Sequence, residues 1–217
     1  MAKVNQFIKS EGYYGNIRTD IIDLILNKPN KILEIVGGKG YTLKKLKELG
    51  KANYIAGIEI DIKVADEARG YLDYVVCEDI EQISSLPFEK NFFDFIIFAD
   101  VLEHLINPVK VIGMFRDYLT NKGSIIATIP NLRHKSVIMP LVFKGQFKYD
   151  PEGGSLDISH LRFYTRESII SLFKVAGYPK IEFYDYPLSF KAKLASFFTF
   201  GFLKDFFVYK FRVVARK

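Results

Sequence analysis

Short apolar segments alternate with amphipathic ones through the first 130 residues. Apolar runs typical of buried strands are predicted at residues 31–36, 54–60, 73–77, 93–98 and 124–129. Apolar residues at helical spacing predict helices at residues 16–27, 42–49, 63–71 and 108–119. Strands that alternate with helices in this way favour a parallel sheet covered on both faces.

The alternation ends after residue 130. Residues 131–163 are polar and aromatic and are interrupted by glycines and prolines, so we expect a long loop that acts as a lid on the acceptor side of a site. A helix is predicted at residues 166–176, then two closing strands at 181–186 and 206–215, with residues 187–205 as an insertion between them. We expect a single domain over residues 1–217.

A glycine-rich turn follows the first predicted strand and leads into a helix. It reads Glu34-Ile35-Val36-Gly37-Gly38-Lys39-Gly40. Such a turn lets the backbone approach a ligand closely and directs helix N–H groups toward negative charge. The next two strands end on acids, Glu59 and Asp79, which could accept hydrogen bonds from ribose hydroxyls and from an adenine amino group. Together these features favour a nucleoside ligand.

These segments resemble class I S-adenosylmethionine-dependent methyltransferases. ILEIVGGKG is similar to the family's first motif, GIEID to the second and CEDIE to the third, and the segment from FDFIIFADVLEHL to IATIPN is similar to the fourth and fifth. ISHLRFYTRESIISLFKVAGY and the lead-in YYGNIRTDII resemble a branch often encoded near, or fused to, glycosyltransferases. The resemblance covers about residues 13–186. It implies an α/β, Rossmann-like fold with a seven-stranded, mostly parallel sheet, helices on both faces and an antiparallel last strand.

The resemblance also implies S-adenosylmethionine as cofactor, with S-adenosylhomocysteine as product. The residues that match its binding positions are Tyr14, Arg18, Glu34, Val36, Gly38, Gly40, Glu59, Ile60, Asp79, Ile80 and Asp100. In this assignment Glu59 binds the ribose, Asp79 and Ile80 contact adenine, and Arg18 pairs with the cofactor carboxylate. Val36 departs from the family pattern, because it replaces a glycine and a β-branched residue resists positive φ.

Three residues are candidates for the chemistry of methyl transfer: His104, His160 and Arg162. A hydroxyl acceptor must lose a proton, and the imidazole of His104 suits that task. The alternative is that His104 starts a helix and bonds to backbone. His160 and Arg162 are expected on the acceptor side, unless His160 only packs and Arg162 pairs with an acid such as Asp157. Because His104, His134 and His160 match no compact ligand spacing, we expect no metal site.

Composition and charge argue against a membrane-spanning, a secreted and a nucleic-acid-binding protein. Hydrophobic residues make up 49% of the chain, there is no apolar run long enough to cross a membrane, and the first residues lack the apolar core of a secretory signal. The single cysteine, Cys77, excludes an intrachain disulfide, so we expect a cytoplasmic protein. The net charge of +6 comes from residues 188–217, and this confinement to one segment argues against nucleic-acid binding.

Residues 190–211 carry nine aromatic side chains among lysines. They are interpreted either as a peripheral contact with a membrane or lipid-like acceptor, or as a segment that packs on the core or on a second subunit of a homodimer. The chain as a whole is predicted to methylate a small molecule, by O-methylation of a sugar, glycolipid or quinone-type acceptor. The alternatives are a non-catalytic nucleoside-binding or scaffold protein, suggested by Val36, and a nicotinamide-dependent oxidoreductase, whose third glycine is Leu43 here.

Overall fold

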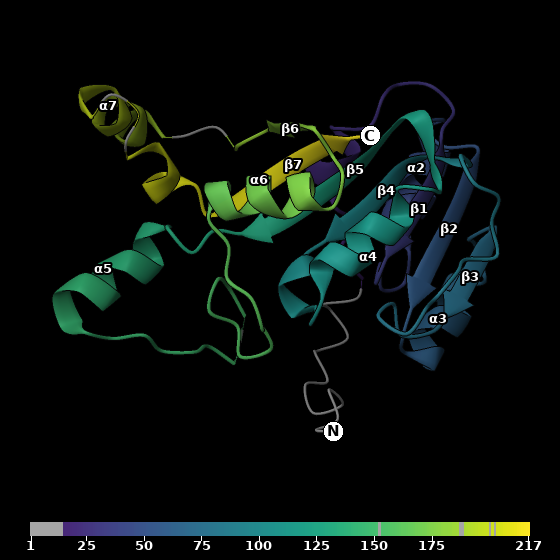
Figure 1. Cartoon of the computed structure of the whole chain (residues 1–217), viewed down its shortest axis with the longest axis horizontal. Helices are drawn as coiled ribbons and strands as arrows, with labels where there is room; N and C mark the ends of the chain where they lie inside the picture. Colours follow the sequence, from purple (N-terminus) through teal and green to yellow (C-terminus); the bar gives the residue numbers. More distant parts are fainter. Residues whose placement is uncertain (1–14, 152, 187–188, 200, 202) are drawn as a thin grey trace.

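In a computed structural model, residues 15–151, 153–186, 189–199, 201 and 203–217 are described. They form one seven-stranded sheet with helices packed around it (Figure 1). The strands are β1 (Lys31–Ile35), β2 (Tyr54–Glu59), β3 (Tyr74–Cys77), β4 (Phe93–Ala99), β5 (Leu119–Pro130), β6 (Lys180–Phe183) and β7 (Lys210–Arg216). The helices are α1 (Thr19–Ile22), α2 (Tyr41–Glu48), α3 (Ile62–Ala68), α4 (Pro108–Phe115), α5 (Lys135–Lys144), α6 (Arg166–Val175) and α7 (Phe190–Phe198), with short 3₁₀ helices η2 (Leu102–His104) and η3 (Lys204–Phe207).

The strand order is β3-β2-β1-β4-β5-β7-β6. Strands β1 to β5 run parallel, and β7 lies antiparallel to both of its neighbours, β5 and β6. The predicted Rossmann-like sheet with an antiparallel last strand is therefore confirmed. The chain moves outward from β1 to β3 and then returns to the other side of β1 as β4, so the order reverses between β1 and β4. Sheets of this kind bind ligands beyond the carboxyl ends of their strands at that reversal.

Alternating residues of the central strands enter cores on opposite faces of the sheet. On β1, Leu33 and Ile35 join a core that includes residues of α4 and α6, whereas Ile32 joins the core that α1 and α2 cover. All three side chains are fully buried. Both faces of β1 are therefore covered, which is why apolar residues stand at adjacent positions of the strand.

The N-terminal helix is shorter than predicted. Only Thr19–Ile22 is helical, although the apolar pattern continues to residue 26. The ammonium group of Lys51 donates to the backbone carbonyls of Ile22 and Ile25, at 2.9 and 3.1 Å. Because a tertiary contact satisfies these carbonyls, the chain turns toward β1 without completing further helical turns.

Two helices lie in the segments that were predicted as a lid loop and as an insertion. Residues 131–163 contain α5, and residues 187–205 contain α7, while β7 begins at Lys210 rather than at residue 206. Helix α5 has no buried apolar stripe, since Val142 and Phe143 are 65% and 73% exposed, so helical periodicity could not reveal it. Figure 1 shows α5 and α7 projecting at the left of the view, away from β1 to β3. Among the described residues, no helix is both long and apolar enough to cross a bilayer.

Candidate functional site

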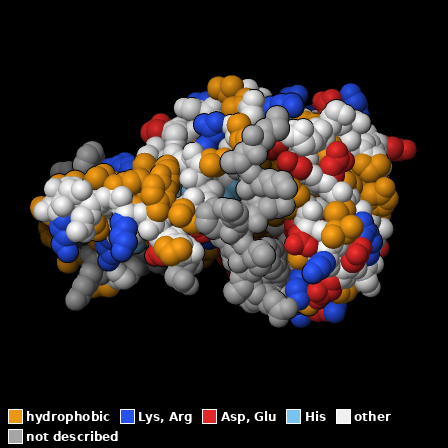
Figure 2. All heavy atoms as spheres, turned by 90° about the horizontal axis from the view of Figure 1, so that it is seen from below, with side chains coloured by type: hydrophobic (Ala, Val, Ile, Leu, Met, Phe, Trp, Pro, Cys, Tyr) orange, Lys and Arg blue, Asp and Glu red, His pale blue; other side chains and the backbone are white. Residues whose placement is uncertain are grey.

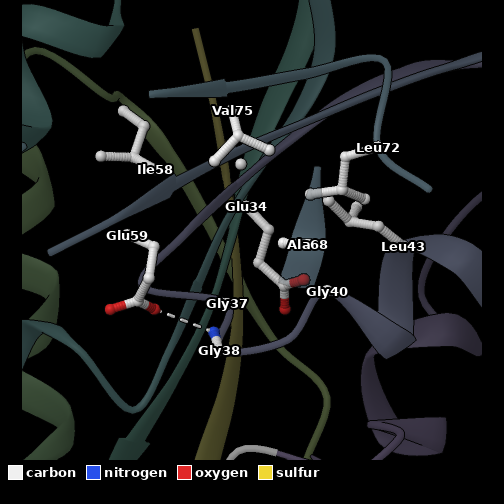
Figure 3. A pocket seen from close by; sticks show the side chains of 11 residues that line it. Glu34, Gly37, Gly38, Gly40, Leu43, Ile58, Glu59, Ala68, Leu72 and Val75 are labelled. Carbon is white, nitrogen blue, oxygen red and sulfur yellow. Dashed lines mark hydrogen bonds between the residues drawn. The ribbon is translucent and has the colours of Figure 1, made fainter. Parts of the chain in front are cut away.

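A cavity of about 1310 Å³ lies beyond the carboxyl ends of the central strands. The predicted site residues that line it are Arg18, Glu34, Val36, Gly38, Glu59, Ile60, Asp79, Ile80, Asp100 and His104. Gly40 lines a small adjoining pocket beneath the glycine turn (Figure 3). Tyr14 lies outside the described residues. His160 and Arg162 do not line the cavity.

Glu59 is fixed at the end of β2 by three backbone N–H groups. One carboxylate oxygen accepts from Ile60 and Asp61 at 2.9 and 3.1 Å, and the other accepts from Gly38 of the glycine turn at 3.1 Å (Figure 3). Burial raises the pKa of Glu59, and the three donors oppose that rise. Since a carboxylate offers about four acceptor sites, this arrangement holds the side chain rigidly and leaves capacity for a hydroxyl donor in the cavity.

Glu34 is the next-to-last residue of β1, and its carboxylate points toward the glycine turn (Figure 3). One carboxylate oxygen, Oε2, is buried and has no hydrogen-bond partner among the described residues. Burial raises the pKa of Glu34 to about 8, and the nearby charge of Glu59 adds to the rise. A Cβ at Gly37 would come within 2.8 Å of this carboxylate, so the turn needs a glycine at that position. The pair of acids thus offers a buried acceptor that a ligand could satisfy.

Val36 adopts the backbone conformation that its residue type disfavours. Its φ is 51°, in the left-handed region, and the next glycines of the turn, Gly38 and Gly40, have φ of 58° and 73°. The valine N–H still donates to the Ile58 carbonyl at 2.7 Å, and the side chain is 38% exposed at the cavity wall. The expected resistance to positive φ therefore does not prevent the turn, and the cavity stays open beside the valine. The strain of such a residue is of the order of 1–3 kcal/mol.

Arg18 and Asp100 form an ion-pair cluster in the lining of the cavity. The Arg18 guanidinium donates to Asp20 and, at 2.8 Å, to Asp100. Asp100, with φ of 57°, also accepts from Lys210 at 2.7 Å and from Thr128 at 3.0 Å. Burial lowers the pKa of Arg18, but the bond to Asp20 and the charge of Asp100 outweigh it, so the net shift is upward. Arg18 thus has internal carboxylate partners, in addition to the cofactor carboxylate expected from the sequence.

The two candidate histidines lie close together, beside the end of the cavity away from the glycine turn. Their ring centroids are 4.9 Å apart, and the ring of His104 lies at the cavity wall. Arg162 donates to the backbone carbonyls of Leu105 and Ile106, not to Asp157, so it braces the loop after η2. The alternative pairing of Arg162 with Asp157 is wrong, because Asp157 instead accepts from the backbone and hydroxyl of Ser159.

Several cavity residues were not identified from the sequence. They are Asp61, Glu81, Thr128, His134, Tyr186, Tyr209 and Lys210, of which all but Thr128 line the cavity. Asp61 lies two residues after Glu59 and caps α3, so its position just after a strand was a usable signal. Lys210 reaches Asp100 from 110 residues further along the chain, and no local pattern indicates such a contact.

The comparisons agree with this architecture. The sequence model of a family described as Methyltransferase domain matches residues 12–182. Similar solved structures include a SAM dependent methyltransferase from Archaeoglobus fulgidus (17% identity, TM-score 0.67, 97% of this chain and 96% of that chain) and one from Mesorhizobium loti (14%, 0.63, 94% and 99%). A possible histamine N-methyltransferase from Thermotoga maritima is also similar (16%, 0.62, 91% and 86%). At these identities the structural likeness shows the fold. No curated protein matches the chain.

Proposed function

The chain belongs to the methyltransferase-domain family, and on that premise we propose that it methylates an oxygen of a small molecule with S-adenosylmethionine as donor. The observation that carries the proposal is the pair of buried acids at the reversal of strand order. Glu34 lies one residue before the end of β1 and Glu59 ends the adjacent strand β2, and both line a cavity that continues to His104. This arrangement offers one polar end for a nucleoside and another for an acceptor.

The described residues fit the proposed cofactor. Glu34 has a buried oxygen with no partner, which an ammonium group can satisfy, and Glu59 is held by backbone donors where it can accept from a ribose hydroxyl. Asp79 and Ile80 line the same wall after β3, as expected for contact with adenine. Leu43, the position of the third glycine in a dinucleotide fingerprint, is fully buried in α2, which disfavours the oxidoreductase alternative.

When bound, S-adenosylmethionine supplies an electrophilic methyl group on a positively charged sulfur. An acceptor oxygen forms the new O–C bond as the S–C bond breaks, and its own proton leaves to a base or to solvent. The chain's contribution is to hold both partners close and aligned and to handle that proton. We assign the proton transfer to His104, which lines the cavity and whose ring is oriented by the contact of its Nδ1 with the Ser159 carbonyl at 3.1 Å.

The class of acceptor is proposed from helix α7 and its exposed surface. Helix α7 contributes Ala192 to the cavity lining. Its exposed apolar residues are Phe190, Leu194, Phe197 and Phe198, at helical spacing. Figure 2 shows hydrophobic and basic side chains on the projecting end at the left of the view, and most acidic ones on the other half. A helix with one face at the cavity and an apolar, basic outer face suits an acceptor with a lipid or other apolar tail, such as a glycolipid or quinone, taken up at an anionic membrane surface.

The membrane contact can be measured by co-sedimentation with vesicles. We expect binding to vesicles that contain phosphatidylglycerol and much weaker binding to pure phosphatidylcholine. A Phe197→Ser, Phe198→Ser double variant should bind at least about tenfold less, since burying one such ring is worth about 1.5–3 kcal/mol. Val175→Ser is the matched control, because Val175 is 73% exposed on α6. Equal loss in the control, or a stable dimer that disappears in the double variant, would contradict the membrane role.

The methylation itself is tested with methyl-labelled S-adenosylmethionine and lipid and polar extracts as acceptor pools. We expect label in a product that resists mild base, as a methyl ether does and a methyl ester does not. Glu59→Ala should abolish the transfer at low donor concentration. Label confined to protein or nucleic acid would exclude a small-molecule acceptor.

A further inference from the structure

Glu103, His104 and His160 form a buried cluster beside the acceptor end of the cavity. One ligand atom from each residue can be chosen so that all lie within 4.8 Å of one another. The carboxylate of Glu103 and the ring of His160 are 1% and 5% exposed, and His160 Nε2 lies 3.8 Å from Glu103 Oε1. The backbone carbonyl of Glu103 accepts from Leu161 and Arg162, which ties η2 to the segment that carries His160.

The hydrogen bonds of the two rings indicate where their protons are. The Nδ1 atom of His104 lies 3.1 Å from the Ser159 carbonyl, and the Nδ1 atom of His160 lies 3.3 Å from the Ser155 carbonyl. A carbonyl oxygen only accepts, so each Nδ1 carries a proton, and a neutral ring then has its lone pair on Nε2. For His160 that lone pair faces a buried carboxylate. A cation bound between these two groups would be stabilised by both of them.

We propose that Glu103, His104 and His160 bind one divalent transition-metal cation such as Zn²⁺. Two histidines and one carboxylate are a ligand set that zinc uses with an open position, and ligating histidines commonly donate their other N–H to a backbone carbonyl, as both rings do here. Two ligands on one tetrahedral zinc ion are about 3.4 Å apart, so the atoms of the cluster need only small side-chain rotations to close on an ion. Sequence spacing did not indicate this site because the fold brings His160 to Glu103 and His104, which lie far earlier in the sequence.

The role of the bound cation, though not its binding, rests on the proposed function. His104 lies at the cavity wall, so the open position of the ion faces the acceptor end. A hydroxyl bound there loses its proton to solvent at a lower pH than a free hydroxyl does, because the cation stabilises the oxyanion that attacks the methyl carbon. In the metal-bound protein His104 is then a ligand, and it acts as a base only when the cation is absent.

The test is calorimetric titration of Zn²⁺ into the untagged, full-length protein after treatment with EDTA. We expect one ion per chain and no binding of Mg²⁺ at the same site. His160→Ala and Glu103→Gln should weaken Zn²⁺ binding by about 100-fold or more, since loss of even an outer-shell partner costs about 10–100-fold. His134→Ala is the matched control, because His134 lines the same cavity outside the cluster and should leave the affinity unchanged. Visible absorption of the Co²⁺ form gives a second readout of the coordination.

The variants must be shown to fold, and binding of S-adenosylhomocysteine at the opposite end of the cavity provides that check. If His160→Ala does not fold, His104→Gln replaces it, because His104 is only half-buried. Wild-type protein that binds no Zn²⁺, or His134→Ala that loses as much affinity as Glu103→Gln, would overturn the site and leave a proton-bridged Glu–His pair. Zinc binding with the expected variant pattern but no binding of S-adenosylhomocysteine would overturn the proposed function and leave the metal site intact.

Discussion

The two ends of the cavity are built in different ways. At the cofactor end, Glu59 is held by backbone N–H groups of the glycine turn and of the residues that follow it, at most 21 positions away in sequence. The segments that carry Tyr186 and residues 207–210 of the cavity lining are instead held by ion pairs between residues far apart in the sequence. Arg166 at the start of α6 binds Asp185 and Asp205, and Lys210 binds Asp100. One end is held by backbone hydrogen bonds between residues close in the sequence, and the other by ion pairs between side chains that are distant in the sequence.

This difference predicts that substitutions at the two ends affect different properties, ligand binding at one and stability at the other. Backbone donors move only if the strands move, so substitutions at the cofactor end should change binding more than stability. Side-chain ion pairs at the acceptor end anchor the segments that carry α7 and β7, so substitutions there should change stability and leave nucleoside binding intact.

The largest effect is expected for Arg166→Met. Arg166 donates to both carboxylate oxygens of Asp205 at 3.0 and 3.1 Å and stacks on Phe183 and Phe211, and its side chain is 21% exposed. Breaking a largely buried pair leaves carboxylates without their partner, so urea denaturation should show a loss of about 3 kcal/mol in the free energy of unfolding. Lys45→Met, in the exposed pair with Glu48, should cost less than about 0.5 kcal/mol. A parallel loss of S-adenosylhomocysteine affinity in Arg166→Met would show that the two ends are not independent.

The next largest effect is expected for Glu59→Ala. Loss of the charged acceptor should weaken S-adenosylhomocysteine binding by about 1–3 kcal/mol, or about 5- to 150-fold in Kd. Glu48→Ala, an exposed acid at the end of α2, is the control and should leave Kd unchanged. Unchanged affinity in Glu59→Ala, measured by calorimetry, would remove the assignment of this residue to the ribose.

The pH dependence of binding should report on Glu34. Its pKa is raised from 4.5 to about 8, so the folded protein holds a proton that the unfolded chain has lost. The stabilising effect of this group is fully present below pH 4.5 and is lost as the pH rises toward 8. If the ionised carboxylate pairs with the ammonium group of S-adenosylhomocysteine, affinity should rise with pH by up to about tenfold per unit and level off above 8. Glu34→Gln should bind more weakly with a flat profile, and a sloping profile in that variant would assign the titration to another group.

The smallest effect is expected for Val36→Gly. Removing the strain of a valine in the left-handed region should stabilise the fold by about 1–3 kcal/mol. The greater flexibility of glycine in the unfolded chain lowers that gain by about 0.5–1 kcal/mol. A modest gain in the urea midpoint, with unchanged m-value, is therefore expected. Asn91→Gly is the matched control, because Asn91 has φ of 56° but belongs to a residue type that tolerates it. A clear loss of stability in Val36→Gly would mean that the valine side chain contributes packing that outweighs its strain.

The same contrast explains what could be predicted from the sequence. The strands, the glycine turn and the acids at strand ends are local patterns, and the structure places Glu34, Glu59 and Asp79 along one edge of the sheet. Helix α1 was predicted too long because the bond from Lys51 to the Ile22 carbonyl is tertiary. Tertiary contacts of this kind cannot be predicted from the periodicity of apolar residues.

Most of the structure at the acceptor end could not be predicted from the sequence. Helices α5 and α7 expose their apolar residues, so the rule that apolar stripes face a core does not apply to them. The cluster around Glu103 depends on a loop that returns from residue 160, and the pairing of Lys210 with Asp100 depends on the antiparallel insertion of β7. Residues gathered by topology rather than by spacing become visible only in the folded chain.

The central claim is that the two acids and the glycine turn form a nucleoside site, and calorimetric titration of the wild-type protein with S-adenosylhomocysteine tests it most directly. We predict saturable heat at one ligand per chain and a rise in Tm that grows with ligand concentration, with no such response to NADH. The absence of both heat and thermal shift at saturating S-adenosylhomocysteine would contradict the claim, and a fold without a donor site would remain.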